Sequence, residues 1–136
     1  NGIVFSAGYN GYGQLGWPNH PAGTSFAKVA LPSTFKAEKI FAANSNAWAV
    51  SSSGQSYTWG AGSNDTLGTG YTGTVFTPIL LSTISDYGLV DIAGNYTQTF
   101  AVVSNQSKNR FTPYQCFGQD FRQLSHSGSP SSTHFL

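Results

Sequence analysis

The stretch Phe5-Ser-Ala-Gly-Tyr-Asn-Gly-Tyr-Gly-Gln-Leu-Gly16 recurs twice further along the chain, each time in a weaker form. Its skeleton returns 52 residues later in Tyr57-Thr-Trp-Gly60 and Leu67-Gly68. A decayed third copy follows in Cys116-Phe-Gly118 and Gln123-Leu124. Because a fixed long period is the signature of a repeat architecture, the sequence predicts two repeats and the beginning of a third.

Apolar positions outside these motifs follow the same period. Matches at an offset of 52 residues are Ile40 with Ile92, Trp48 with Phe100, Ala49 with Ala101, and Val50 with Val102. Matches at an offset of 50 residues are Phe26 with Phe76, Val29 with Ile79, and Leu31 with Leu81. The longer spacing before the third copy is taken up by the polar run 105–113, where a turn tolerates extra residues. Insertions confined to turns are typical of repeated structural units.

The residue pattern between turn signals predicts strands throughout. They are expected at 3–7, 26–31, 38–42, 47–52, 56–59, 75–81, 89–93, 99–104 and 114–117. Ser53-Gly54 predicts a tight hairpin turn. Pro78 lies inside one of these runs, which favours an edge strand because proline cannot donate to a ladder. In the glycine-rich loop, Gln14 and Leu15 are expected to point inward or to bridge neighbouring units.

The order of these segments resembles the regulator of chromosome condensation repeat. The resemblance rests on the Gly-Tyr-Gly-Gln-Leu-Gly motif ending at Gly16, a Pro-containing extended segment, Ile-Ala-Gly at 92–94 with Phe-Ala-Val at 100–102, and Tyr-Thr-Trp-Gly at 57–60. It implies an all-β fold of β-propeller blades, each with four antiparallel strands. The chain departs from the repeat at Ala42-Ala43, where a glycine is usual, and it lacks the histidine common in that turn.

On this resemblance, residues 1–124 form propeller blades. Repeat 1 is expected at about 3–54, repeat 2 at about 55–110, and the start of repeat 3 at about 111–124. Residues 125–136 are expected to form an extended Ser/His/Pro tail. Two blades and part of a third make a partial propeller, so we expect further chain, or alternatively assembly of copies, to complete it.

Composition and charge disfavour several partners. Charged residues make up 8% of the chain and its formal net charge is +1, so bulk electrostatics do not favour nucleic acid. No apolar run is long enough to span a membrane. Neither a small-molecule substrate nor a cofactor is indicated.

The sequence indicates no catalytic or metal site. The five Asp and Glu residues form no close pair, and the three histidines lack ligand spacing. Ser125-His126-Ser127 lacks an orienting acid. Gly8, Gly11 and Gly13 lack the Lys-Ser/Thr of a phosphate loop. Cys116 is expected to be a small buried hydrophobic residue. The sequence therefore predicts a protein that is not an enzyme.

The aromatic residues divide into core and surface candidates. Trp48 and Trp59 align with phenylalanines in later repeats, which indicates packing. Trp17 has no such counterpart, so we expect an exposed anchor at an interface. Tyr9, Tyr12 and Trp17 are the candidate protein contacts, together with the loop 62–66.

Three glycosylation sequons begin at Asn64, Asn95 and Asn105. Together with the low charge, these sequons favour an extracellular or cell-surface location for the protein. An intracellular location is the alternative. The function expected is that of a non-catalytic propeller that binds protein partners or self-assembles. The alternative implied by the resemblance is guanine-nucleotide exchange on a small GTPase, which the absence of a basic arm disfavours.

Overall fold

The structure, a computed structural model, describes residues 1–19, 23–105 and 110–118, the last of these and Asn105 by their backbone. In this part the chain folds into antiparallel β-sheets and two short 3-10 turns, η1 (Ser63–Asp65) and η2 (Ser82–Ile84). The strands are β1 (Phe5–Gly8), β2 (Gly23–Lys28), β3 (Ala37–Ala43), β4 (Asn46–Ser51), β5 (Ser56–Gly60), β6 (Val75–Leu80), β7 (Tyr87–Gly94), β8 (Gln98–Asn105) and β9 (Arg110–Gly118). These described residues contain no helix with the length and hydropathy needed to cross a bilayer.

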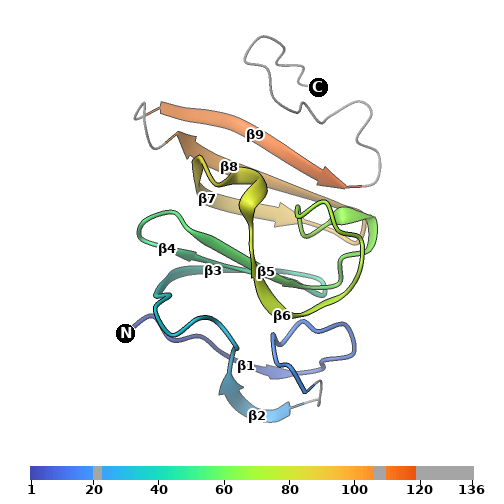
Figure 1. The fold of residues 1–136 in the computed structure, drawn as a ribbon. Coiled ribbons are helices and arrows are strands. Elements are labelled where there is room, and N and C mark those ends of the chain that lie inside the picture. The colour runs from blue at the N-terminus through green and yellow to red at the C-terminus, as the bar shows by residue number, and fades with distance from the viewer. Residues whose placement is uncertain (20–22, 106–109, 119–136) are drawn as a thin grey trace.

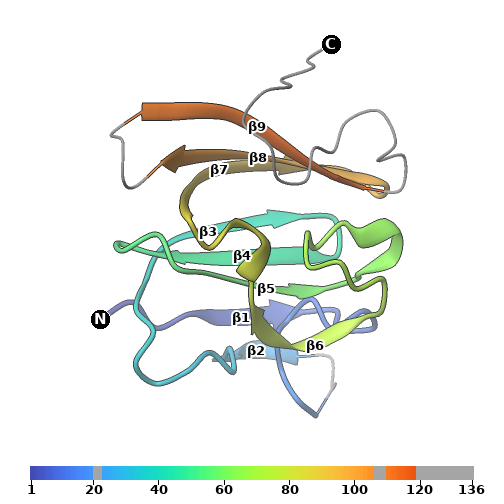
Figure 2. The same cartoon turned by 45° about the horizontal axis from the view of Figure 1, so that its top comes forward.

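The strands form three sheets that stack as layers (Figures 1 and 2). A two-stranded sheet holds β1 and β2, a four-stranded sheet has the order β3-β4-β5-β6, and a three-stranded sheet has the order β7-β8-β9. The four-stranded sheet is the middle layer. This arrangement confirms the predicted all-β class with blade-like antiparallel sheets. Pro78 lies in β6, at the edge of the middle sheet, as its residue type predicted.

Both faces of the middle sheet are covered, which explains why β4 is apolar on both sides. Successive side chains of a strand point to opposite faces. Ala47 and Ala49 therefore point to one face and Trp48 to the other, and all three are at most 7% exposed. The first face packs against Val4 and Val29, which flank β1 and β2, and the second packs against residues of β7 and β8.

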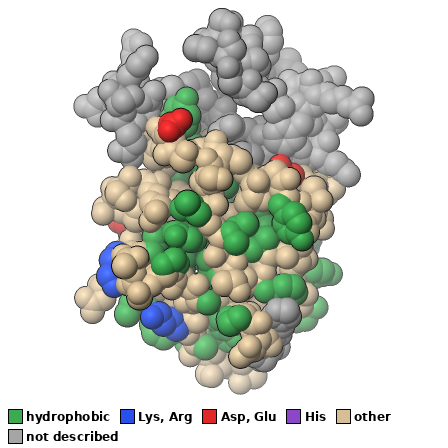
Figure 3. Space-filling view, viewed as in Figure 1, with side chains coloured by type: hydrophobic (Ala, Val, Ile, Leu, Met, Phe, Trp, Pro, Cys, Tyr) green, Lys and Arg blue, Asp and Glu red, His purple; other side chains and the backbone are tan. Residues whose placement is uncertain are grey.

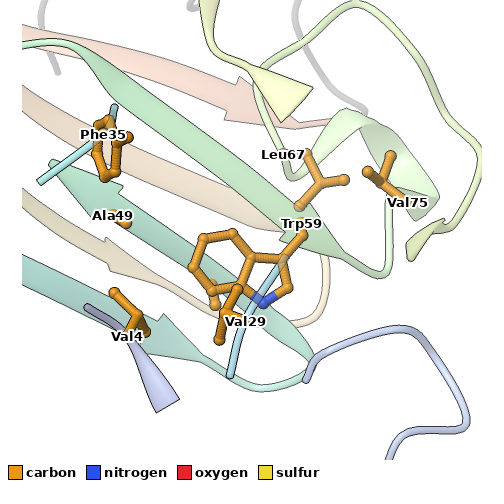
Figure 4. Packing of buried hydrophobic residues seen from close by; sticks show 8 residues of the cluster. Val4, Val29, Phe35, Ala49, Trp59, Leu67 and Val75 are labelled. Carbon is orange, nitrogen blue, oxygen red and sulfur yellow. The ribbon is translucent and has the colours of Figure 1, made fainter. Parts of the chain in front are cut away.

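Two hydrophobic clusters fill these interfaces. The first core consists of Val4, Val29, Phe35, Ala47, Ala49, Trp59, Leu67 and Val75. In Figure 4, the ring of Trp59 lies in the middle of this cluster. The second core consists of Trp48, Val50, Leu81, Ile84, Leu89, Ala101 and Val103. The burial of Trp48 and Trp59 confirms that these two residues are packing residues.

The sequence repeat and the sheets are out of phase. The hairpin at Ser53-Gly54 forms as predicted, with Gly54 N–H donating to the Ser51 carbonyl at 2.9 Å. This hairpin connects β4 to β5 in the middle of the four-stranded sheet. The middle sheet thus takes β3 and β4 from before the turn and β5 and β6 from after it. The repeat boundaries given above stay a prediction.

One strand lies earlier in the chain than expected. The strand predicted at 26–31 is β2, which begins at Gly23 and ends at Lys28. Val29 N–H donates to the Val4 carbonyl at 3.0 Å, and Val29 enters the first core from outside the strand. Phe26 is 77% exposed because it lies on the face of β2 that no other sheet covers.

Candidate functional site

The loops at one end of the sheets gather beside one another, on the right in Figure 1. They are the loop 9–16 after β1, the turn between β3 and β4, the loop 61–74 after β5 and the turn between β7 and β8. We call this set the loop end. Because each sheet contributes a loop to it, the loop end is built by residues that are far apart in the sequence.

A groove of about 220 Å³ lies at the loop end. Its walls carry two exposed tyrosines, Tyr12 from the loop after β1 and Tyr96 from the β7–β8 turn, which are 52% and 79% exposed. The remaining lining residues are small or carry amide and hydroxyl groups: Asn44, Ser45, Asn46, Ala61, Ser63, Thr66 and Asn95. The groove therefore offers aromatic surface and uncharged polar groups.

A buried hydrogen-bond network holds the floor of the groove. The amide of Asn46 donates to Thr66 Oγ1 at 2.9 Å. Thr66 Oγ1 lies 3.0 Å from the Ser63 carbonyl and 3.1 Å from the Ala61 carbonyl, to which it can donate its hydrogen. The hydroxyl of Thr99, on β8, donates to the Thr66 carbonyl at 2.8 Å. Thr66 thus ties the loop after β5 to both β4 and β8.

Replacing Thr66 with valine tests this network. Valine keeps the shape of threonine but removes the acceptor for Asn46, whose buried amide then loses its partner. Leaving such a group unsatisfied costs about 1–3 kcal/mol. We expect a loss of that size in the free energy of unfolding measured with urea. Thr72→Val, at an exposed position of the same loop, is the control and should change stability by less than about 0.5 kcal/mol. An equal effect of the two substitutions would contradict the network.

The loop that carries Tyr12 is held by its own polar groups. Asn10 is 1% exposed, and its side-chain oxygen accepts from the Leu15 backbone N–H at 3.0 Å. Trp59 Nε1 donates to the Gln14 carbonyl at 2.9 Å, which joins the loop to the middle sheet. Leu15 is buried. Leu15 therefore points inward as expected, and Gln14 joins the loop to the middle sheet through its backbone carbonyl, while its side-chain oxygen accepts from Tyr12 N–H at 2.9 Å.

The turn that carries Tyr96 is also fixed locally. The side-chain oxygen of Asn95 accepts from the backbone N–H groups of Thr97 and Gln98 at 2.9 and 3.0 Å. Asn95 N–H donates to the Gln98 carbonyl at 2.9 Å. An asparagine that caps its own turn in this way limits the motion of the residue after it. Tyr96 is therefore presented on a defined turn.

The predicted contact residues fall into two groups. Tyr9 is 65% exposed and packs edge to face against Tyr12, with ring centroids 6.2 Å apart. Both remain predicted contacts. The expectation that Trp17 is exposed is wrong, because its side chain is 8% exposed. Its ring packs onto Gly23, where an added Cβ would overlap the indole. Gly23, at the start of β2, thus lies against the ring.

Several predicted positions concern glycosylation or cysteine chemistry. Asn64 lies in η1 with φ of 61° and is half-buried, whereas Asn95 is exposed. The side chains of Asn105 and Cys116 and the segment 125–136 lie outside the residues whose placement is described. Glycan occupancy and cellular setting stay predictions.

Charge is sparse at the loop end. Burial raises the pKa of Asp65, and hydrogen bonds from the backbone of Gly70 and Thr69 partly oppose that shift. In Figure 3, the Lys and Arg side chains of the visible face lie on the left, away from the loop end. No group of three or more His, Cys, Asp or Glu that suits a metal ion occurs among the described residues.

The sequence pattern did not single out Tyr96 or Asn46, whereas Thr66 lies in the loop 62–66, a predicted contact. A signal existed in the repeat, because Asn44 to Asn46 and Tyr96 to Gln98 occupy equivalent turns from which the usual histidine is missing. Both turns contribute residues to the groove. The groove itself depends on how the sheets stack.

Residues 53–102 match the regulator of chromosome condensation (RCC1) repeat. Among solved structures, human WBSCR16 has 23% identity and a TM-score of 0.64, with 77% of this chain and 26% of that chain covered. Prp20p from Saccharomyces cerevisiae, described with its binding properties to Gsp1p and histones, has 20% identity and a TM-score of 0.55, with 67% and 24% covered. Yeast RCC1 (Prp20) bound to Kap60 has 21% identity and a TM-score of 0.55, with 67% and 23% covered.

These likenesses show the fold, and the chain spans about a quarter of the length of the proteins it matches. The repeat match includes β5, β6, β7 and most of β8. Together with the stacked antiparallel sheets, it confirms the resemblance read from the sequence. Residues 53–102 thus carry an RCC1-like repeat.

Proposed function

We propose that the chain is a non-catalytic protein-binding module whose groove at the loop end receives a segment of a partner protein. The observation that carries this proposal is the pair of exposed tyrosines, Tyr12 and Tyr96, placed on the same groove by two different sheets. Tyrosine supplies a large, rigid contact surface with a polar tip, and it is enriched at interfaces.

The composition of the loop end supports the proposal. Loops rich in Tyr, Ser, Gly and Asn form the binding surfaces of antibodies, because tyrosine provides contact area and the small polar residues provide adaptable hydrogen bonds. The loops 9–16 and 61–74 have this composition. The groove offers aromatic faces, amides and hydroxyls, a set that suits recognition better than acid–base or nucleophilic chemistry.

The proposal extends a property of similar proteins. Prp20p is described as binding Gsp1p and histones, and yeast RCC1 has been solved with Kap60. Those proteins support protein binding as the general class of function for this chain. They do not identify its partner, because the identity is 20–21% and this chain covers about a quarter of their length.

The test compares partner retention by the wild-type chain with retention by Tyr12→Ala and Tyr96→Ala. Each tyrosine is exposed, so neither substitution should change the melting temperature. Truncating an interface hot spot costs about 2 kcal/mol or more, so the affinity of a purified partner should fall on the order of thirtyfold. Phe26→Ala is the control, because Phe26 is as exposed as Tyr96 but does not line the groove.

A partner identified by affinity purification counts only if the purified pair reproduces this pattern. Unchanged affinity in both tyrosine variants would contradict the proposed site. Release of a fluorescent nucleotide from a purified small GTPase is measured in parallel. We expect no acceleration by the chain, and an acceleration would replace the proposal with nucleotide exchange.

A further inference from the structure

The floor of the groove at the loop end holds more hydrogen-bond acceptors than donors. The carbonyls of Ala61 and Ser63 lie 3.1 and 3.0 Å from Thr66 Oγ1. A hydroxyl has one hydrogen, so only one of these carbonyls can receive it at a time. Because that hydrogen points to a carbonyl, Thr66 Oγ1 must accept from Asn46 Nδ2, which lies 2.9 Å away. The network therefore fixes which way round the Asn46 amide is oriented.

This orientation leaves Asn46 Oδ1 without a donor. Among the described residues it has no hydrogen-bond partner, although the Asn46 side chain is only 5% exposed. Buried acceptors without a partner are rare in folded proteins, and each one costs stability until a donor is supplied. Since Asn46 lines the groove, a ligand that enters the groove can supply that donor.

The walls of the groove favour a cation. Tyr12 and Tyr96 both line it and are more than half exposed, so their ring faces are available to a ligand. An aromatic ring attracts a cation that lies over its face. Of the described residues, no Lys, Arg or His lines the groove, and the one charged residue in the loop 61–74 is the acidic Asp65. No positive charge therefore opposes a cation at this place.

We propose that the groove receives an arginine side chain of the partner segment, with its guanidinium against Tyr12 and Tyr96 and an N–H directed to Asn46 Oδ1. This inference rests on the proposed function and adds the chemistry that the partner segment must carry.

Arginine fits the groove better than other side chains with N–H groups. Its guanidinium has five N–H donors and no acceptor, so it brings only donors to a floor that lacks them. A side-chain amide would bring a further acceptor. Lysine also has donors, but its compact ammonium is more strongly hydrated than a guanidinium and stacks less well on an aromatic face. Charge, donors and flat shape thus select the same side chain.

The experiment uses the full chain, labelled with nitrogen-15, and acetyl-arginine methylamide as the probe, followed by NMR. We expect saturable chemical-shift changes at the side-chain amide of Asn46 and the backbone amide of Tyr96. The dissociation constant should be about 1–10 mM, as for a small probe that fills one side-chain site.

Three matched probes separate the two interactions. Acetyl-citrulline methylamide keeps the shape of arginine but has no charge, and acetyl-trimethyl-lysine methylamide keeps a charge but has no donor. Because each lacks one interaction, each should bind about tenfold more weakly than the arginine probe. Acetyl-norleucine methylamide lacks both and should not bind measurably.

Variants of exposed tyrosines locate the site without disturbing the buried network. Tyr96→Phe keeps an aromatic face, whereas Tyr96→Leu keeps only apolar surface. The arginine probe should therefore bind about threefold more weakly to Tyr96→Leu than to Tyr96→Phe. Tyr71→Leu is the control, because Tyr71 is exposed on the loop 61–74 but does not line the groove, and it should leave binding unchanged.

The inference is overturned if the arginine probe does not bind, if the trimethyl-lysine or norleucine probe binds as tightly, or if Tyr71→Leu weakens binding as much as Tyr96→Leu. A partner protein that loses affinity in Tyr12→Ala and Tyr96→Ala, while the arginine probe fails to bind, would overturn the arginine site and leave protein binding at the groove in place. Binding of the probe together with unchanged partner affinity in both variants would support the arginine site and contradict the proposed function.

Discussion

Gly60→Val is expected to leave little or no folded protein at room temperature. Gly60 has φ of 111°, a conformation that side chains with a Cβ rarely adopt, and that strain alone costs about 1–3 kcal/mol. A Cβ at this position would also overlap the backbone carbonyl oxygen of Ser45. Because β5 and the turn before β4 meet here, relief of the overlap would require the ladder to separate.

Gly8→Val is the matched control. Gly8 is the repeat equivalent of Gly60 and has nearly the same φ, 117°, but an added Cβ would meet no atom within 4 Å. It should therefore show the conformational cost without the steric overlap. Circular dichroism during heating and in urea measures both variants. Gly60→Val melting at or above the temperature of Gly8→Val would contradict the close approach of β5 to the β3–β4 turn.

Trp48→Ala is expected to lower the free energy of unfolding by about 3–5 kcal/mol, the range for removing a large buried aromatic side chain. Trp48 is 1% exposed and belongs to the second core, which joins the middle sheet to the three-stranded sheet. Truncation would leave a cavity between two layers. Since single domains are stable by only about 5–15 kcal/mol, this loss should populate unfolded chains in mild urea.

Phe100→Ala is the comparison for Trp48→Ala. Phe100 occupies the same position in the next repeat but is 42% exposed, so its loss should cost about 1 kcal/mol or less. Urea denaturation followed by tyrosine and tryptophan fluorescence measures both. Equal costs for the two substitutions would show that the second core does not bind the layers together.

The repeat made most strands of this fold predictable from the sequence. In the repeat, β4 aligns with β8, β1 with β5, and β2 with β6. Each copy therefore supports the assignment of strands in the others. The edge position of Pro78 and the burial of Trp48 and Trp59 followed from local chemistry. These features depend on residue type and period, which are visible in the chain itself.

The features that could not be predicted depend on contacts between distant segments. Trp17 is buried because the chain after the loop brings Gly23 against its ring, and no local pattern records that return. Tyr96 belongs to the candidate site because the three-stranded sheet stacks next to the middle sheet. Phe26, an apolar residue in a strand, is exposed because no other described sheet covers its face of β2. The pattern of a single strand does not show which of its faces another sheet will cover.

The hairpin at Ser53-Gly54 has a consequence for how such a chain grows or shrinks over evolutionary time. On the repeat boundaries predicted from the sequence, the repeated unit begins and ends near this turn, in the middle of a sheet. Each unit therefore contributes the last two strands of one sheet and the first two strands of the next sheet. When one unit is deleted, the pair of strands before it and the pair of strands after it can still form one four-stranded sheet. The hydrogen-bond ladder of that sheet then stays intact. The number of blades can thus change without any intermediate in which two complete blades must be linked by a new connection.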